Sequence, residues 1–183
     1  MANFVSRAGE KLQFALDQFS ISVKDLTIAD FGSSTGGFVD CLLQNGAKKV
    51  FSVDTAYGEL AWRLRNDPRV VVIERTNAMH VVLPEKVDLI TVDTSWTKQK
   101  NVLPNVFKNL KDSGRIISLI KPHYEAGKGK LTDEEVKQVL QKVTEEIKEI
   151  GGGIEGLVES PILGEKGKNR EYLISITSKS AEA

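Results

Sequence analysis

Residues 30–38 read DFGSSTGGF and lie between a short apolar run and a helical pattern. In chains that alternate strands and helices, a glycine-rich turn after the first strand is where a nucleotide-like ligand binds. Gly32, Gly36 and Gly37 allow the backbone to approach a ligand closely, and the helix that follows offers free N–H groups. This turn therefore predicts both an α/β fold and the position of its ligand site.

The spacing of the glycines narrows the choice of ligand. A dinucleotide fingerprint reads G-x-G-x-x-G and a phosphate loop ends in Gly-Lys-Ser/Thr, whereas this turn reads G-x-x-x-G-G. Asp30, directly before the first glycine, would repel a pyrophosphate and suits a ligand that carries an ammonium and a sulfonium group. We infer an adenosyl ligand, S-adenosylmethionine; a purely structural turn is the alternative. The predicted contacts in the turn are Asp30, Gly32, Ser33, Ser34, Gly36, Gly37 and Phe38.

Two later strand ends support this ligand. Asp54 closes the second predicted strand, where a carboxylate can accept hydrogen bonds from both ribose hydroxyls. Asn77 and Ala78 follow the third strand, where the edge of an adenine would lie. Tyr57 comes shortly after Asp54 and is a further predicted contact, with core packing as its alternative role.

Strand-like and helix-like patterns alternate along the chain. Short β-branched runs at 26–31, 49–54, 70–74, 87–93 and 115–120 predict strands. Helical patterns at 7–19, 37–45, 57–66, 98–110 and 132–150 separate or flank them. Strands at 154–159 and 171–177, joined by a short loop, should pair antiparallel. We expect one α/β domain over 1–183: a helical extension (1–25), then a Rossmann-like core (26–183) with a mostly parallel seven-stranded sheet, an antiparallel last strand and helices on both faces.

Composition excludes several classes of protein. The chain has 183 residues, 40% of them hydrophobic and 27% charged, which suits one globular domain. It has one cysteine, Cys41, and two histidines, so we expect no metal site and a reducing, cytoplasmic setting. The net charge is zero, but residues 131–155 carry seven acids and three lysines, which leaves the rest of the chain basic.

Four ionisable residues stand where chemistry is expected. Asp93 and Lys121 close the fourth and fifth predicted strands, at the edge of the sheet where ligands bind, and Asp93 is also a predicted cofactor contact. Lys11 lies on the N-terminal helix and Glu171 opens the last strand; a solvated lysine and an edge-strand charge are their alternatives. His123 and Tyr124, next to Lys121, are candidates for the substrate side.

Several motifs, in order, resemble one family. These are residues 6–12 (SRAGEKL), 30–46, 53–62, 66–70 and 120–122 (IKP). They are similar to the FtsJ-type RNA ribose methyltransferases, and to the TlyA branch of that superfamily, whose members methylate ribose 2′-hydroxyls of ribosomal RNA and are often labelled haemolysins. The resemblance covers nearly the whole chain. It implies the fold of S-adenosylmethionine methyltransferases, ribosomal RNA or a ribosomal subunit as partner, and a catalytic tetrad that falls on Lys11, Asp93, Lys121 and Glu171.

The chemistry of a ribose hydroxyl fits these residue types. The hydroxyl is a poor nucleophile and must lose its proton as the methyl group transfers, and a lysine with a lowered pKa can act as the base. Lys121 is the candidate base. Lys11 would lower its pKa by like-charge repulsion, whereas Asp93 and Glu171 would raise it, so the sequence leaves the direction open.

The chain departs from the family pattern at three places. TlyA-type proteins usually carry a small S4 RNA-binding domain before this one, and here we expect it to be lacking. The family usually reads Val-Ser-Phe after the strand-end aspartate, where this chain has Thr94-Ser95-Trp96. The loop after Gly127 is shorter than usual, which predicts a reduced lid over the substrate.

Three other functions compete with an RNA methyltransferase. One is a cofactor-binding module that associates with RNA or the ribosome without turnover, and another is a methyltransferase with a non-RNA substrate. A pore-forming haemolysin is disfavoured because no long apolar or amphipathic membrane segment is present. A basic surface that could contact RNA phosphates is predicted at residues 127–130, Lys98, Lys100, Lys166, Lys168 and Arg170.

Overall fold

The computed structural model describes residues 3–165 and 168–178. Within these residues, seven strands form one sheet in the order β3-β2-β1-β4-β5-β7-β6. The strands are β1 (Thr27–Phe31), β2 (Lys49–Val53), β3 (Val70–Ile73), β4 (Val87–Val92), β5 (Leu110–Ile120), β6 (Gly152–Glu159) and β7 (Tyr172–Ser178). Strands β1 to β5 pair in parallel, and β7 is antiparallel to both β5 and β6. The predicted Rossmann-like sheet is confirmed.

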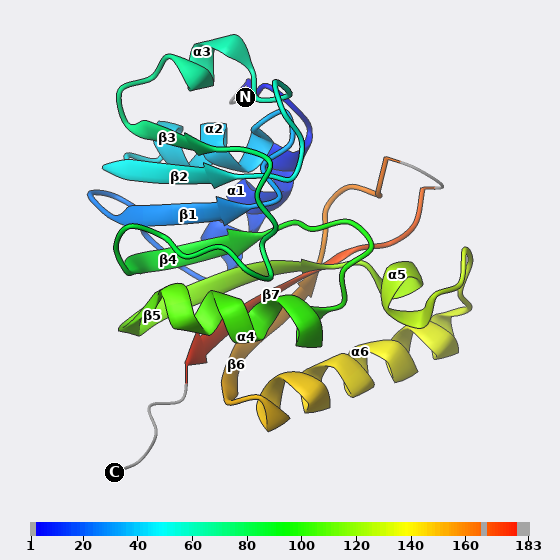
Figure 1. The fold of residues 1–183 in the computed structure, drawn as a ribbon. Coiled ribbons are helices and arrows are strands. Elements are labelled where there is room, and N and C mark those ends of the chain that lie inside the picture. Colours follow the sequence, from blue (N-terminus) through cyan, green and yellow to red (C-terminus); the bar gives the residue numbers. More distant parts are fainter. Residues whose placement is uncertain (1–2, 166–167, 179–183) are drawn as a thin grey trace.

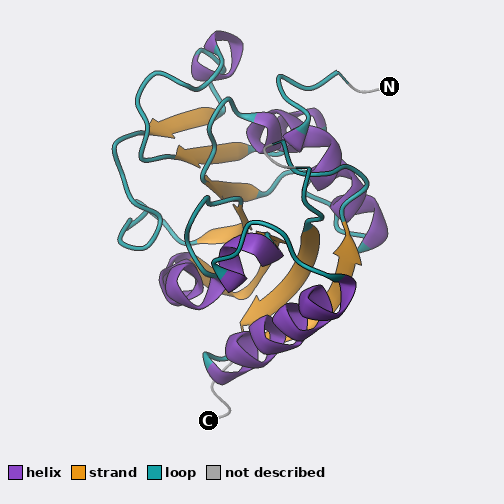
Figure 2. Ribbon diagram, turned by 90° about the vertical axis from the view of Figure 1, so that its right-hand side faces the viewer, coloured by secondary structure: helices purple, strands orange, loops and turns teal. Residues whose placement is uncertain are grey.

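Helices cover both faces of this sheet (Figures 1 and 2). They are α1 (Ala8–Gln18), α2 (Gly37–Gln44), α3 (Trp62–Arg65), α4 (Gln99–Asn109), α5 (Pro122–Ala126) and α6 (Asp133–Glu149). The apolar stripes of α1 and α2 pack with one face of the sheet, and those of α4 and α6 pack with the other. Because helices bury both faces, the central strands are apolar on both sides, which explains why they read as continuous apolar runs.

The long acidic helix begins where the sequence predicts. Thr132 and Glu135 form a capping box: the Glu135 N–H donates to Thr132 Oγ1 (3.2 Å), and the Thr132 N–H donates to Glu135 Oε2 (2.7 Å). Apolar side chains on one stripe of α6, Val136, Val143 and Ile147, are buried against the sheet. The acidic residues therefore lie on the outer side of a helix that packing holds in place.

The predicted helix over 57–66 is wrong. Only Trp62–Arg65 is helical, as α3. Gly58 has a φ of +77°, and its N–H donates to Glu74 Oε1 (2.9 Å), while the Ala61 N–H donates to the carbonyl of Thr35 (3.0 Å). Tertiary hydrogen bonds thus hold this segment in turns.

Two other elements differ from the prediction. The strand predicted at 115–120 begins earlier, at Leu110, and runs to Ile120. A short helix, α5, follows it directly, with Pro122 in its first turn. Proline is favoured there because its fixed φ suits a helix start and its missing N–H would be unpaired in any case.

The carboxyl ends of β1, β2 and β4 meet at one edge, where backbone hydrogen bonds join the loops that follow them. The Gly32 N–H donates to the carbonyl of Val53 (2.8 Å), and the Asp93 N–H donates to that of Phe31 (2.9 Å). The predicted ligand residues are therefore brought to one side of the molecule.

Over the described ranges, none of the helices combines the length and the hydropathy that crossing a bilayer would need.

The capping box of α6 yields a prediction about stability. Thr132→Ala should lower the free energy of unfolding by about 1 kcal/mol, because the Glu135 amide loses its acceptor. Urea denaturation followed by circular dichroism measures this change. Glu134→Ala, on the exposed face of the same first turn, is the matched control, and an unchanged urea midpoint for Thr132→Ala would contradict the role of the cap.

Candidate active site

Two adjoining hollows lie at the carboxyl edge of the sheet. One has a volume of about 530 Å³ and the other about 390 Å³. They share five lining residues, namely Gly32, Ser34, Asp93, Ser95 and Trp96. The two hollows therefore form neighbouring compartments, with the glycine-rich turn and the loop after β4 between them.

The smaller compartment is lined by six of the predicted adenosyl contacts. They are Gly32, Ser34, Asp54, Asn77, Ala78 and Asp93. The Ser34 N–H donates to Asp54 Oδ2 (2.7 Å) and the Ala56 N–H donates to Asp54 Oδ1 (2.8 Å). Two backbone amides thus orient the Asp54 carboxylate, and each oxygen keeps a lone pair for a further donor.

The glycines of the turn serve different purposes. Gly32 has a φ of +89°, and a Cβ there would lie 2.2 Å from the carbonyl oxygen of Asp93. A Cβ on Gly37 would lie 2.2 Å from Ser6 Oγ, and one on Gly36 (φ +101°) would meet Leu64. Gly36 and Gly37 line neither compartment. Their small size is therefore required by packing within the protein.

Asp30 lies beneath the turn and is completely buried, outside the lining of both compartments. Its Oδ1 accepts a hydrogen bond from Thr91 Oγ1 (2.7 Å), while its Oδ2 has no partner among the described residues. Burial raises the pKa of Asp30 to about 7, and the charges of Asp93 and Asp54 add to this rise. Asp30 is thus a carboxylate whose charge is poorly compensated within the protein.

Tyr57 is the predicted contact that the structure places apart from the others. Its side chain is 69% exposed and lines neither compartment. The Arg75 guanidinium lies 4.4 Å from the centroid of its ring. A regular helix over 57–66 was the basis for placing Tyr57 at the ligand edge, and that helix does not form.

The larger compartment holds the four ionisable candidates. Lys121 Nζ lies 2.6 Å from Asp93 Oδ1, and Lys11 Nζ lies 2.5 Å from Glu171 Oε2. Lys11 and Glu171 are buried, with exposures of 8% and 4%. Helix α1, the loop before β7 and the ends of β4 and β5 thus bring together two ion pairs from four distant parts of the sequence. Ser33 and Phe38 of the turn line the same compartment.

The direction of the Lys121 pKa, which the sequence leaves open, is upward. Burial acts to lower the pKa of Lys121, but the charge and hydrogen bond of Asp93, together with the charge of Glu171, outweigh it. Lys121 is therefore an ammonium ion at neutral pH in the free protein.

Three aromatic rings form a wall beside these ion pairs. The Trp96 ring stacks on that of Tyr124, with centroids 4.5 Å apart and planes inclined by 29°. The His123 ring lies 4.2 Å from Tyr124 on a tilted plane, and Lys121 Nζ lies 5.7 Å from the Tyr124 centroid. All of them line the larger compartment. Burial lowers the pKa of His123, so its ring is neutral at pH 7.

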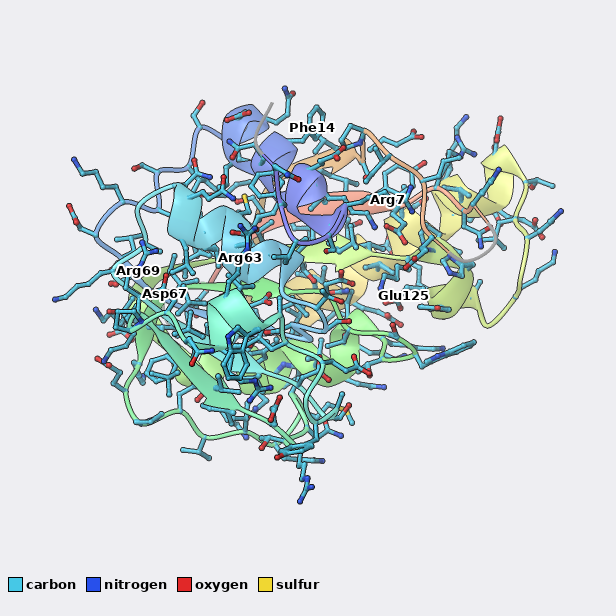
Figure 3. The ribbon with its side chains drawn as sticks, turned by 90° about the horizontal axis from the view of Figure 1, so that it is seen from above. Arg7, Phe14, Arg63, Asp67, Arg69 and Glu125 are labelled. Atoms are coloured by element: carbon cyan, nitrogen blue, oxygen red, sulfur yellow. The ribbon has the colours of Figure 1, made fainter. Side chains whose placement is uncertain are left out.

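Sequence reasoning missed three residues of this compartment. Trp96 drew notice only as a departure from a family motif, although an aromatic residue three positions after a strand-end aspartate is itself a signal. Ser6 and Arg7 also line the compartment. Their position just before Lys11, in the SRAGEKL motif, could have indicated them; Arg7 is labelled near the N-terminal helix in Figure 3.

The predicted basic surface is partly neutralised. Lys100 pairs with Glu146 (3.0 Å), Lys128 with Glu135 (2.5 Å) and Arg170 with Asp133 (2.5 Å). All three partners belong to α6, within the acidic run that the sequence shows at residues 131–155. Lys166 lies outside the described residues.

The chain matches a known protein family over nearly its whole length. The model of the FtsJ-like methyltransferase family matches residues 4–177. The chain is 41% identical to the "Putative rRNA methyltransferase YqxC" of Bacillus subtilis, covering 94% of this chain and 65% of that protein. It is 38% identical to the "16S/23S rRNA (cytidine-2'-O)-methyltransferase TlyA" of Mycobacterium tuberculosis, covering 98% and 70%. The chain thus spans about two thirds of the length of these relatives.

A solved structure supports the same assignment. The crystal structure described as "a putative hemolysin from Lactococcus lactis" matches with a TM-score of 0.91 and 36% identity, over 98% of this chain and 90% of that one. The resemblance that the sequence motifs carry is confirmed by these matches. A single family model spans nearly all of the chain, so the chain belongs to the FtsJ-like methyltransferase family.

Proposed function

We propose that the protein transfers the methyl group of S-adenosylmethionine to a ribose 2′-hydroxyl of ribosomal RNA. The observation that carries this proposal is the pair of ion pairs, Lys121–Asp93 and Lys11–Glu171, in a compartment that shares a wall with the adenosyl compartment. The names of the YqxC and TlyA relatives support ribosomal RNA as the substrate class. A ribosomal RNA substrate also implies that the protein works in the cytoplasm.

The residues of the smaller compartment fit the proposed cofactor, which supplies the electrophilic methyl group. Asp54, held by two amides, would accept hydrogen bonds from the ribose hydroxyls, and Asn77 and Ala78 would border the adenine. The unpartnered Oδ2 of Asp30 gives the turn a negative charge that a cationic ligand compensates. A pyrophosphate would be repelled by the same charge.

Lys121 would bind the acceptor hydroxyl and accept its proton. As an ammonium ion it donates a hydrogen bond to the ribose oxygen and holds it in place; as a base it must first lose its proton. Asp93 lines both compartments, so a cation bound in the smaller one weakens the stabilisation that Asp93 gives to the Lys121 ammonium. The pKa of Lys121 then falls toward the range in which its neutral amine can accept the hydroxyl proton.

The buried Lys11–Glu171 pair would act on position and charge. Glu171 contributes to the raised pKa of Lys121, and Lys11 neutralises Glu171 at a distance of 2.5 Å. Removal of either partner leaves the other charge buried and unpaired, which is costly. The pair therefore holds the acceptor side of the site rigid, which in-line methyl transfer requires.

The aromatic wall would receive the nucleobase. Trp96 is 81% exposed and stacks on Tyr124, so its free face is open to a second ring. Stacking of a base on an aromatic side chain is worth about 1–3 kcal/mol. A nucleobase held there would place its ribose near Lys121.

Substitution of Lys121 tests the catalytic assignment. Lys121→Ala should reduce methyl transfer from labelled S-adenosylmethionine to ribosomal RNA by about 100-fold or more, because proton transfer and hydroxyl positioning are both lost. Nuclease digestion and mapping of the labelled RNA would show ribose methylation in the wild type. Binding of S-adenosylmethionine, measured by calorimetry, should persist.

Lys24→Ala changes an exposed lysine before the start of β1, at the opposite end of that strand from the glycine turn; it is the control and should retain full activity. Undiminished methyl transfer by Lys121→Ala would overturn the role of Lys121. A wild-type protein that binds the cofactor but labels no RNA would favour the binding module instead.

The pKa of Asp30 predicts how cofactor affinity depends on pH. Because the carboxyl group titrates near pH 7 in the free protein and its charged form favours a cationic ligand, affinity should fall as the pH drops below 7. Between pH 7.5 and pH 6 the fall should reach up to about tenfold. Calorimetric titration across this range measures it.

Asp30→Asn removes the titrating group while keeping an oxygen for Thr91, and should abolish this pH dependence. Asp54→Asn is the matched comparison: it should weaken binding at every pH but leave the dependence in place. Equal pH profiles for wild type and Asp30→Asn would contradict the role of Asp30.

A further inference from the structure

The aromatic wall is assembled from two separate segments. Trp96 comes from the loop between β4 and α4, whereas His123 and Tyr124 come from α5. The two segments are joined by one hydrogen bond, in which the backbone N–H of Gln99 donates to Glu125 Oε1 (2.8 Å). Gln99 is the first residue of α4, three positions after Trp96.

The side chain of Gln99 ties this junction to the sheet. It is buried, with 3% exposure, and its Nε2 donates to the carbonyl of Leu119 (3.1 Å). Ser118 Oγ donates to Gln99 Oε1 (2.6 Å). Both partners lie on β5, just before Lys121. We call Gln99, Ser118, Leu119 and Glu125 the Gln99 junction.

Glu125 supplies what the start of α4 lacks. The N-cap residue, Lys98, makes no side-chain capping bond, so the first amide of the helix takes its acceptor from α5. A carboxylate at a helix N-terminus also interacts favourably with the helix dipole. Glu125 is therefore a tertiary cap that fixes where the loop from β4 ends.

Glu125 itself lies away from the reacting groups. It lines a separate hollow of about 160 Å³, together with Lys98, Lys142 and Glu146. Figure 3 labels it on the side of the molecule where α5 and α6 lie. Burial and the charge of Glu146 raise the pKa of Glu125, while Lys98 and Lys100 oppose the rise. Its carboxylate thus faces away from the compartment that His123 and Tyr124 line.

The position of the Trp96 ring depends on contacts that hold its loop in place. Its backbone has a φ of +61°, a left-handed conformation that is costly for a bulky residue, and 81% of its side chain is exposed. The stack on Tyr124 is the aromatic contact that holds the ring. A small loss of order at either end of the loop should therefore release it.

We propose that Glu125 is a positioning residue: by capping α4 at Gln99 it holds the loop 94–98 against α5, and so keeps the Trp96–Tyr124 stack in place for the acceptor nucleotide. Its effect on RNA rests on the proposed function, whereas its effect on the stack does not.

Spectroscopy of Trp96 tests the junction without RNA. The chain has two tryptophans, so Trp62→Phe, at an exposed position, leaves Trp96 as the single reporter. In this background, Glu125→Ala should lower the fluorescence anisotropy of Trp96 and reduce the near-ultraviolet circular dichroism of the stacked rings. Glu125→Gln, which keeps an oxygen acceptor for the Gln99 amide, should restore most of both signals.

Two further variants make the result specific. Thr132→Ala removes a cap from another helix, α6, and should leave the Trp96 signals unchanged. Gln99→Pro removes the donating N–H from the other side of the same bond, at a helix position that accepts proline, and also the side chain that bonds Ser118 and Leu119, so it should lower the Trp96 signals at least as far as Glu125→Ala. Unchanged Trp96 signals in both Glu125→Ala and Gln99→Pro would overturn the proposal.

Kinetics with ribosomal RNA test the consequence. Loss of a cap of ordinary strength corresponds to about a five- to tenfold change in an equilibrium constant. Glu125→Ala should therefore raise the KM for RNA by that factor, change kcat less, and leave the affinity for S-adenosylmethionine unaltered, with rescue by Glu125→Gln. A disordered stack with an unchanged KM would refute the positioning role, whereas an inactive wild type would refute the proposed function and leave the spectroscopic result standing.

Discussion

The close approach of the glycine turn to the loop after β4 is the constraint on which the site depends. A Cβ at Gly32 would lie 2.2 Å from the carbonyl oxygen of Asp93, so this position must lack a side chain. The contact brings the end of β1 against the end of β4, and with it the turn against the loop that carries Asp93. Because Gly32 and Asp93 then line both compartments, methyl donor and acceptor would meet across one shared wall.

Charge is distributed unevenly across that wall. On the donor side, Asp30 is buried with an unpartnered oxygen and a pKa of about 7. On the acceptor side, the half-buried Lys121 and the buried Lys11 each have a carboxylate within 2.6 Å, from Asp93 and Glu171 respectively. The donor side therefore favours a cation, while the acceptor side is already balanced and can hold a neutral hydroxyl. This asymmetry is what a sulfonium donor and a ribose acceptor require.

Ion pairs also form on the outer surface of the protein. Acids of α6 pair with Lys100 and Arg170, which come from distant segments, and with Lys128 from the loop just before the helix. The acidic run of α6 thus neutralises part of the basic surface of the same protein. With these basic side chains paired, the aromatic wall is the surface that would contact the acceptor nucleotide. Its two halves are joined through Gln99 and Glu125. Recognition at this edge therefore depends on stacking and loop order as well as on positive charge.

The sequence by itself determined the alternation of strands and helices, the ligand turn and the positions of Asp93 and Lys121, because strand ends in a parallel sheet converge on one edge whatever the details of packing. Lys11 and Glu171 joined these candidates through the resemblance to a known family. The sequence could not place Tyr57, since the left-handed backbone of Gly58 and the hydrogen bonds that the Gly58 and Ala61 amides donate to Glu74 and Thr35 override a helical pattern. Nor could it decide the direction of the Lys121 pKa, because that depends on the distance to Asp93 and on burial. The aromatic wall and the Gln99 junction likewise form only when segments that are distant in sequence meet. Local pattern thus determined where functional groups stand along the chain, and tertiary structure decided which of them touch and what charge they carry.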